Sequence, residues 1–343
     1  MSTITIGLDL GDRYSRFCEL SPEGVVLTEG RLPTTRTALA RQFEAHPACR
    51  IVCEVGTHSP WVSRLLASWG HEVLVANARQ VRLIYAAHRK SDRIDAATLA
   101  RLGRLDPELL RPIRHRGADA QAALAQLRAR DALVRVRTVL INHVRGAVKA
   151  MGERLPASSA VAFARTAGPA VPLALQPALT PLLPMIETLT NQIRAVDREL
   201  ETLALTRYPE TARLRQVSGV GLLIALAFVL TVEDPGRFAK SREIGPYLGL
   251  CPRQADSGRS QPQLRISKRG DALLRRLLVN GAQYILGPFG PECTLRRKGL
   301  ALAAHGGKNA KKRAVVATAR RLAVLLHRLW VSGAAYEPDR QAA

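Results

Sequence analysis

Four acidic residues have the types and spacing to hold a metal ion. Asp9 lies in a predicted first strand, and Glu54 ends a predicted fourth strand. Asp92 and Asp95 are three residues apart on a predicted helix, so both project from one face of it. Four carboxylates that meet repel one another unless cations lie between them, and Mg²⁺ prefers carboxylate oxygens. Such ions activate a nucleophile and stabilise the leaving oxygen at a phosphodiester, so the ordered set predicts phosphodiester chemistry, although each acid alone is more typical of a turn cap.

A polar segment at 251–260 offers a nucleophile. Ser257 is followed by glycine, which lets the backbone approach a substrate closely. Nearby arginines can clamp a phosphate and stabilise its developing charge, and a serine there can attack phosphorus. Composition alone favours an ordinary loop serine, so both interpretations stay open. The arginines are Arg253, Arg259, Arg265 and Arg269.

A glycine-punctuated turn at 216–221 is similar to the hairpin of helix-hairpin-helix modules. In such modules, backbone N–H groups at a helix start contact a phosphate without reading sequence. Gly219 and Gly221 would supply those groups. A tight turn between two packed helices explains the pattern equally well.

The predicted elements that position the acids alternate between strands and helices in the order βββαβαβα. This order is typical of an α/β RNase H-like fold, with an antiparallel three-stranded meander extended by parallel strands. Period-two alternation and turn residues predict the strands, and capping residues predict the helices. The strands are expected at 3–10, 16–20, 25–32, 50–55 and 72–76, and the helices at 34–46 (capped by Thr34 or Thr35), from 59 to Gly70, at 78–87 and from 91 onward.

The rest of the chain is predicted to be mainly helical. Long helices at 118–151 and 185–203 flank a Pro-rich stretch at 152–184, which is expected to be a loop or a loosely packed excursion. The two helices suggest an antiparallel hairpin or a dimerising coiled coil. A compact helical unit is expected at 213–250, a loop-rich basic stretch at 283–312, a last helix at 313–331 and a disordered tail at 335–343. The aromatic side chains Phe238, Tyr247 and Trp330 are predicted to be core residues.

Composition points to a polyanionic partner. The 343 residues carry 51 Lys and Arg against 28 Asp and Glu, a net charge of +23. Residues 251–343 alone hold 18 basic and 5 acidic side chains, and residues 101–150 hold 11 and 4, whereas residues 1–100 are nearly neutral. Nucleic acid is the usual partner of so basic a chain, and no amphipathic basic anchor supports the alternative of a membrane surface.

Other sequence features exclude several classes of protein. No uninterrupted apolar run of membrane-spanning length exists, and the first residues do not have the pattern of a signal peptide. The five cysteines form no CxxC pair, which argues against a zinc ribbon or disulfide scaffold and favours a reducing cytosol. The segment 7–11 also fits the phosphate loop of actin-like kinases, but no second phosphate loop accompanies it.

The motifs together resemble the DEDD transposases of bacterial insertion sequences, the family associated with bridge-RNA-guided recombination. The resemblance covers about 4–115 and about 210–285. It rests on the order of several segments: Asp9, Glu54, the 90–96 segment KSDRIDA, the 217–221 segment VSGVG, the 247–252 segment YLGLCP, the 256–258 segment DSG, and the 266–270 segment ISKRG followed by LRRLL at 274–278.

The resemblance implies a RuvC-like domain in which Asp9, Glu54, Asp92 and Asp95 bind Mg²⁺, and a C-terminal transposase domain in which Ser257 links covalently to DNA. It implies a structured guide RNA, DNA partners at the element ends and target, a homo-oligomer that joins the two centres across subunits, and a bacterial cytoplasmic, nucleoid-associated location. Base pairing would then read the sequence, as in other RNA-guided enzymes. Arg253, Arg259, Arg265, Lys268, Arg269 and the two turn glycines would contact nucleic acid.

The segment after Glu54 departs from the family pattern. It has the sequence VGTHSPW at 55–61, where the commoner family form is Glu-x-Thr-Gly-x-Tyr. The fallback residues are Asp12 for the acid and Ser260 or Ser267 for the nucleophile.

We therefore expect four parts: a metal domain at 1–115, a helical connector at 116–205, a transposase domain at 206–334 and a tail at 335–343. The expected reaction is DNA strand cleavage and transfer in transposition. The alternatives are a RuvC-type metal-only junction endonuclease and a non-catalytic nucleic-acid-binding protein.

Overall fold

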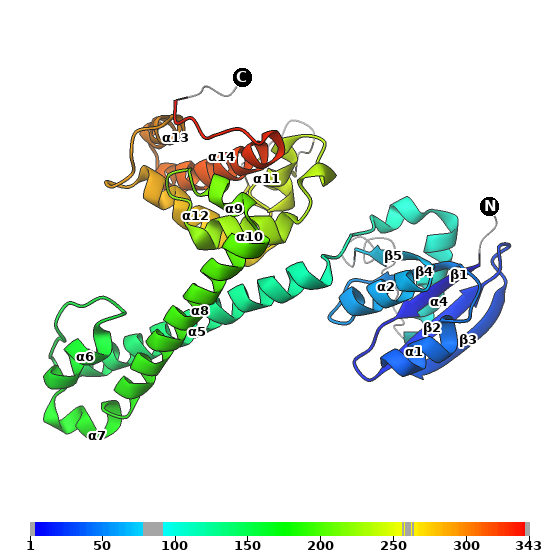
Figure 1. Ribbon diagram of the computed structural model, residues 1–343, viewed down its shortest axis with the longest axis horizontal. Coiled ribbons are helices and arrows are strands. Elements are labelled where there is room, and N and C mark those ends of the chain that lie inside the picture. Colours follow the sequence, from blue (N-terminus) through cyan, green and yellow to red (C-terminus); the bar gives the residue numbers. More distant parts are fainter. Residues whose placement is uncertain (1–3, 78–91, 256, 258–261, 263, 340–343) are drawn as a thin grey trace. The chain divides into compact units, whose positions relative to one another are not determined.

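A computed structural model of the chain describes residues 4–77, 92–255, 257, 262 and 264–339. Its internal contacts divide it into two compact units, Met1–Ala118 and Asp119–Ala343. The elements of both units are labelled in Figure 1. Each unit has its own hydrophobic core and is described by itself.

The first unit is built on a mixed five-stranded sheet with the strand order β3-β2-β1-β4-β5. The central strand β1 pairs antiparallel with β2 and parallel with β4, while the outer pairs are antiparallel β2–β3 and parallel β4–β5. All five strands lie within two residues of the predicted bounds. They are β1 (Thr5–Asp9), β2 (Tyr14–Leu20), β3 (Val26–Pro33), β4 (Arg50–Glu54) and β5 (Glu72–Ala76).

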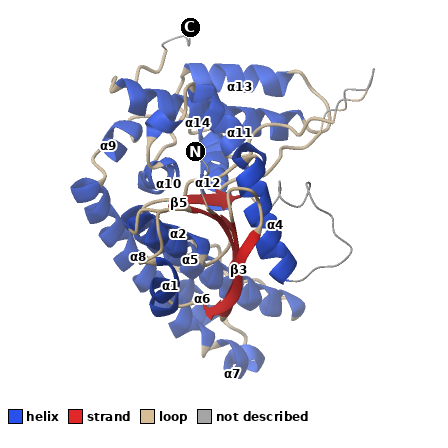
Figure 2. Cartoon of the chain, turned by 90° about the vertical axis from the view of Figure 1, so that its right-hand side faces the viewer, coloured by secondary structure: helices blue, strands red, loops and turns tan. Residues whose placement is uncertain are grey.

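Helices cover both faces of this sheet (Figure 2). Helices α1 (Arg36–Phe43) and α2 (Ser59–Ser68) pack on one face, where Phe43 lies in a core with Leu8. Helix α4 (Asp92–Leu105) covers the other face and brings Ala96 against Cys18. Because strand side chains alternate between faces, the sheet separates two cores. The helix predicted at 78–87 lies outside the described residues.

Local capping chemistry sets the start of α1. The Thr35 side chain accepts a hydrogen bond from the Ala38 N–H, which satisfies a donor in the first turn of the helix. The neighbouring Thr34 hydroxyl instead donates to the carbonyl of Gly11 at 2.9 Å. The sequence predicted either threonine as the N-cap, and the structure shows that Thr35 is the capping residue.

The second unit begins with two long helices, α5 (Ala118–Ala150) and α8 (Leu182–Arg207). They run antiparallel, because Arg130 of α5 binds Asp197 of α8 while the later Arg137 binds the earlier Thr190. The predicted hairpin of two long helices is therefore present.

The prediction of a loop or a loosely packed excursion at 152–184 is wrong for the part of the segment from Phe163 onward, whereas residues 153–159 do form a loop. The segment contains α6 (Phe163–Ala167) and α7 (Gln176–Leu179) and closes a core of its own, in which Phe163 is fully buried against α5 and α8. Its prolines do not prevent folding, because Pro169 and Pro177 stand in the first turns of short helical segments, where the missing N–H costs nothing.

The remaining helices form one C-terminal core, to which the predicted core aromatics Phe238, Tyr247 and Trp330 contribute. No helix in the described ranges is long and apolar enough to cross a membrane. The helices are α9 (Glu210–Leu214), α10 (Leu222–Val232), α11 (Ile244–Tyr247), α12 (Ala272–Leu286), α13 (Thr294–Ala304) and α14 (Ala310–Ser332). Short 3-10 segments lie at Pro107–Leu110, Gly168–Ala170, Leu173–Leu175, Pro235–Arg237 and Ser241–Glu243.

Two further predictions are corrected here. The stretch at 283–312 is mainly helical, because the end of α12, the whole of α13 and the start of α14 together cover more than half of it. Helix α13 packs on its neighbours through Gly299, where a Cβ would overlap Thr318 and Leu286. The described part of the predicted disordered tail, residues 335–339, is held by hydrogen bonds: the Tyr336 N–H donates to Gln216 Oε1, and the Thr294 N–H donates to the carbonyl of Pro338.

Candidate active-site residues

Asp9 and Glu54 end two neighbouring parallel strands. The ladder between β1 and β4 pairs Leu8 with Cys53, and each strand then continues by one residue, to Asp9 and to Glu54. Adjacent strands lie about 4.8 Å apart, so the two acids stand side by side at one edge of the sheet. Both are partly buried.

Both acids lie on the face of the sheet that α4 covers. A Cβ on Gly7 would overlap the backbone of Ala96, and Gly103 contacts Val52. Side chains two residues apart on a strand share a face, so Asp9 follows Gly7 and Glu54 follows Val52 on the α4 side.

The packing of α4 brings its first turn to the level of Asp9. Gly103 lies beside Thr5, whereas Ala96 and Ala100 lie beside Gly7, so α4 runs antiparallel to β1. Two strand residues advance about 6.6 Å, the rise of roughly 4–5 helical residues. Asp9 is two residues beyond Gly7 on β1, so it lies level with the stretch of α4 between Asp92 and Asp95.

The other two acids lie in the first turn of α4. Asp95 is partly buried on α4, whereas Asp92 is described only by its place at the start of this helix. Among the described residues, no group of three His, Cys, Asp or Glu side chains is close enough together to hold a metal ion. The two strand acids offer carboxylate oxygens, the ligand type that a hard divalent cation prefers.

Two histidines that sequence reasoning passed over hold the turn after Glu54. The Ser59 hydroxyl donates to the Gly56 carbonyl at 2.9 Å and lies 2.8 Å from His115 Nε2. Burial, followed by the charges of Arg64 and Arg116, lowers the pKa of His115. No spacing in the sequence links His115 to this turn, because the contact is long-range.

The second histidine is His58. Its Nδ1 accepts a hydrogen bond from Trp61 at 3.0 Å, and its Nε2 lies 3.6 Å from Asp12. Asp12, the fallback acid, is therefore engaged with the turn after β4, and its side chain is almost fully exposed.

Ser257 belongs to a loop whose two ends are hydrogen-bonded to each other. The Arg253 N–H donates to the Arg265 carbonyl at 3.0 Å, and the Ser267 N–H donates to the Cys251 carbonyl at 2.9 Å. We call residues 251–267 the serine hairpin. Ser257 itself is exposed. Arg259 and Ser260 lie outside the described residues.

The glycine turn at 216–221 packs against α12. Gly219 has a φ of +82°, and a Cβ there would lie 2.9 Å from the carbonyl of Gly281. Gly221 caps the start of α10 and is exposed. The turn thus has a structural role in the core, and its contact with phosphate stays a prediction.

The structure brings Asp9 and Glu54 together and places them on the face covered by the helix that carries the other two acids. The acids belong to Met1–Ala118 and Ser257 to Asp119–Ala343, so the two candidate chemistries belong to different units.

Comparison with known proteins identifies the chain. A family model described as a transposase (DEDD_Tnp_IS110) matches residues 6–152, and a model of the IS116/IS110/IS902 transposase family matches residues 211–293. The chain is 31% identical over 290 residues to the transposase for insertion sequence element IS1328 of Yersinia enterocolitica, covering 82% of this chain and 83% of the relative. It is 30% identical over 302 residues to the transposase for IS1111A of Coxiella burnetii, covering 82% and 77%.

The chain has two carboxylates at one edge of a sheet, a basic helical unit and relatives that are transposases. It is therefore a transposase, an enzyme that cleaves DNA and transfers strands. The chain belongs to the IS110 family of insertion-sequence transposases, which confirms the resemblance found in the sequence.

Proposed function

We propose that this transposase cuts and rejoins DNA with two sets of residues. The acids Asp9, Glu54, Asp92 and Asp95 would hold Mg²⁺ in a RuvC-like, RNase H-like domain at 1–115, and Ser257 would be the nucleophile of a transposase domain at 206–334, with the helices of 116–205 connecting them. The observation that carries the proposal is the adjacency of Asp9 and Glu54 on the face covered by α4.

The chemistry assigned to Ser257 is a transesterification. Its Oγ attacks the phosphorus of a DNA phosphodiester, a P–Oγ bond forms and the bond from phosphorus to one deoxyribose oxygen breaks. The proton leaves the serine hydroxyl and the departing sugar oxygen gains one, so the number of phosphate ester bonds is unchanged. A second strand's hydroxyl can then reverse the reaction and release the serine.

A divalent ion held by the acids would supply Lewis-acid stabilisation of the phosphate's developing charge. The chain's own contribution is to hold the carboxylates before the substrate arrives. The backbone pairing of β1 with β4 fixes Asp9 beside Glu54, and the close packing of α4 on Gly7 fixes the helix that carries Asp95.

Nucleic acid would be held by the basic residues of the second unit. We assign this role to Arg253, Arg259, Arg265, Lys268, Arg269 and the backbone at Gly219 and Gly221. We further propose a structured guide RNA and a homo-oligomer in which acids and serine of different subunits meet. The exposed apolar side chains of Val136 and Val139 on α5 support an association through the long helices.

A covalent-trapping experiment tests the proposal. The protein is incubated with element-end DNA, the RNA of the element's flanking region and Mg²⁺, and protein-bound DNA is sought on a denaturing gel. We expect an adduct that is absent from Ser257→Ala and retained in Ser267→Ala, the matched control at the base of the hairpin. Cleavage without any adduct would replace the serine mechanism with a metal-only endonuclease.

A further inference from the structure

A groove of about 1370 Å³ runs along α14 in the unit Asp119–Ala343. Its lining includes apolar side chains of α14, such as Val316 and Val324. Its other walls come from α13, from the base of the serine hairpin and from the docked tail at 334–338. We call it the α14 groove. Helix α14 lies outside both ranges, 6–152 and 211–293, that the family models match.

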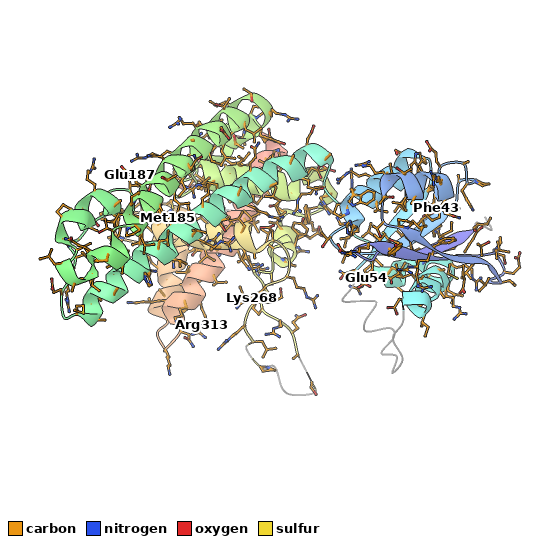
Figure 3. All side chains as sticks on the ribbon, turned by 90° about the horizontal axis from the view of Figure 1, so that it is seen from below. Phe43, Glu54, Met185, Glu187, Lys268 and Arg313 are labelled. Carbon is orange, nitrogen blue, oxygen red and sulfur yellow. The ribbon has the colours of Figure 1, made fainter. Side chains whose placement is uncertain are left out.

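The charge of the α14 groove is almost entirely positive. Eight of its lining side chains are Lys or Arg, and one, Glu337, is acidic. Lys268 and Arg313 are labelled in Figure 3. In the described part of the chain, Arg320, Arg321 and Arg328 have no carboxylate within ion-pairing distance, although eleven ion pairs are formed elsewhere.

The cations recur regularly along α14. Arg313, Arg320 and Arg328 are seven and eight residues apart, so they lie on one stripe of the helix, with about 10–12 Å between successive arginines. The opposite side of α14 is buried in the C-terminal core through residues such as Leu322 and Leu326. The stripe lies on the side of α14 away from this core, although the Arg320 side chain passes over Gly245. The mutual repulsion of its charges has a cost in stability that an anionic ligand would remove.

We propose that the α14 groove binds the sugar–phosphate backbone of a nucleic acid strand, RNA or DNA, and leads it to the serine hairpin. Arg320, Arg321 and Arg328, which have no carboxylate partner in the described part of the chain, suit the phosphates of a strand, and the apolar lining suits the sugar and base faces between them. Pro252 and Ile266, which pair at the base of the hairpin, also line the groove. The role of the hairpin rests on the proposed function, whereas binding in the groove rests on its charge.

The test compares two variants with equal loss of charge, both in a Ser257→Ala background that carries out no serine chemistry. Arg321→Gln/Arg328→Gln removes two cations of the groove, and Arg194→Gln/Arg198→Gln removes two exposed cations of α8. Binding is measured with 30-nucleotide single-stranded RNA, single-stranded DNA and duplex DNA at several salt concentrations.

We expect the groove variant alone to weaken binding of at least one probe about 10–50-fold near 0.1 M salt and to lower the salt slope by about 1.4–1.8, since each lost phosphate contact contributes 0.7–0.9. The probe that responds distinguishes RNA from DNA. Arg321→Lys/Arg328→Lys should restore most of the binding, which separates lost charge from misfolding.

Equal affinities and salt slopes of the two Gln variants for all three probes would overturn the inference. So would loss of self-association in the groove variant with binding unchanged, because the occupant would then be a second protein copy. The covalent-trapping result is independent of both outcomes: a missing adduct with a binding defect in the groove variant would reject the serine mechanism and keep the groove.

Discussion

Asp9 and Glu54 are neighbours across the parallel ladder of β1 and β4, one step beyond the pair Leu8–Cys53. Both lie on the face of the sheet that α4 covers. The backbone pairing therefore holds the two acids on neighbouring strands before a substrate arrives. The relationship gives the proposed metal site its most direct test.

Replacing either acid should abolish strand cleavage and leave the fold intact. We expect Asp9→Asn and Glu54→Gln each to lower the cleavage rate at least 100-fold, because an amide loses the charge that attracts a divalent ion. Glu72→Gln is the matched control. Glu72 is an exposed acid that pairs with Arg50, and it lies at the start of β5, whereas Asp9 and Glu54 lie at the ends of their strands. Calorimetric titration with Mg²⁺ gives the second readout. Full activity in both variants would contradict the site.

Gly7→Ala should loosen α4 from the sheet. The added Cβ would overlap the backbone of Ala96 and Ala100, which cannot give way as a side chain can. We expect a loss of about 2–3 kcal/mol in the free energy of unfolding, together with reduced cleavage. Gly56→Ala is the control, because a Cβ added there would meet open space. Equal unfolding midpoints in urea for the two variants would refute the close approach.

Lowering the pH should loosen the turn after Glu54, because His115 becomes protonated. The pKa of His115 is lower in the folded protein than in the unfolded chain, so the unfolded chain binds more protons between the folded value and about 6.5. The contribution of His115 to the free energy of unfolding is therefore fully present above pH 6.5 and falls as the pH drops through this window. The Gly56 N–H donates a hydrogen bond to Ser59 Oγ. As the pH falls from about 7 to about 5, we expect hydrogen exchange at this amide to be faster than the intrinsic pH dependence of amide exchange predicts.

The His115→Gln variant should lose most of this pH dependence, since it has no group that titrates there. His143→Gln, at an exposed position on α5, serves as the control and should behave like the wild type. Exchange at Gly56 that follows only the intrinsic trend in the wild type would remove His115 from this role.

Phe163→Ala should unfold the tip of the long hairpin without disturbing the sheet. Phe163 is fully buried in the small core that also contains Val144 and Ile186. Truncation of such a side chain typically costs about 3–5 kcal/mol. Limited proteolysis should then cut within 152–184 first. Unchanged resistance at that segment would mean that the tip is held by other contacts.

Thiol reactivity should distinguish one cysteine from the other four. Burial raises the pKa of Cys53 to about 12, and burial with the charge of Glu19 raises that of Cys49 to about 12, so both stay protonated at pH 8. Cys18 and Cys293 are also buried, and Cys251, at the base of the serine hairpin, is partly exposed. Ellman's reagent should label one thiol in the native protein and five in denaturant. Cys251→Ser should abolish the native signal, and rapid labelling of Cys53 would contradict its burial.

Some features of the fold follow from the sequence because they are encoded locally. Alternation of apolar residues gave the five strands within two residues, and Gly70, with its φ of +90°, ends the turn after α2 as a glycine can. Two predictions went wrong for the same reason. The Pro-rich segment and the 283–312 stretch have weak local signals and become ordered only through long-range packing around Phe163 and Gly299.

The sequence by itself determined which residues could do chemistry: it placed Asp9 and Glu54 at strand ends and Ser257 among arginines, because residue type and period are local properties. Only the tertiary structure decided what lies beside them. The contact of Gly7 with α4, the hydrogen bond of Ser59 with His115 and the α14 groove each join segments far apart in the chain, and such contacts depend on packing geometry that no local pattern records.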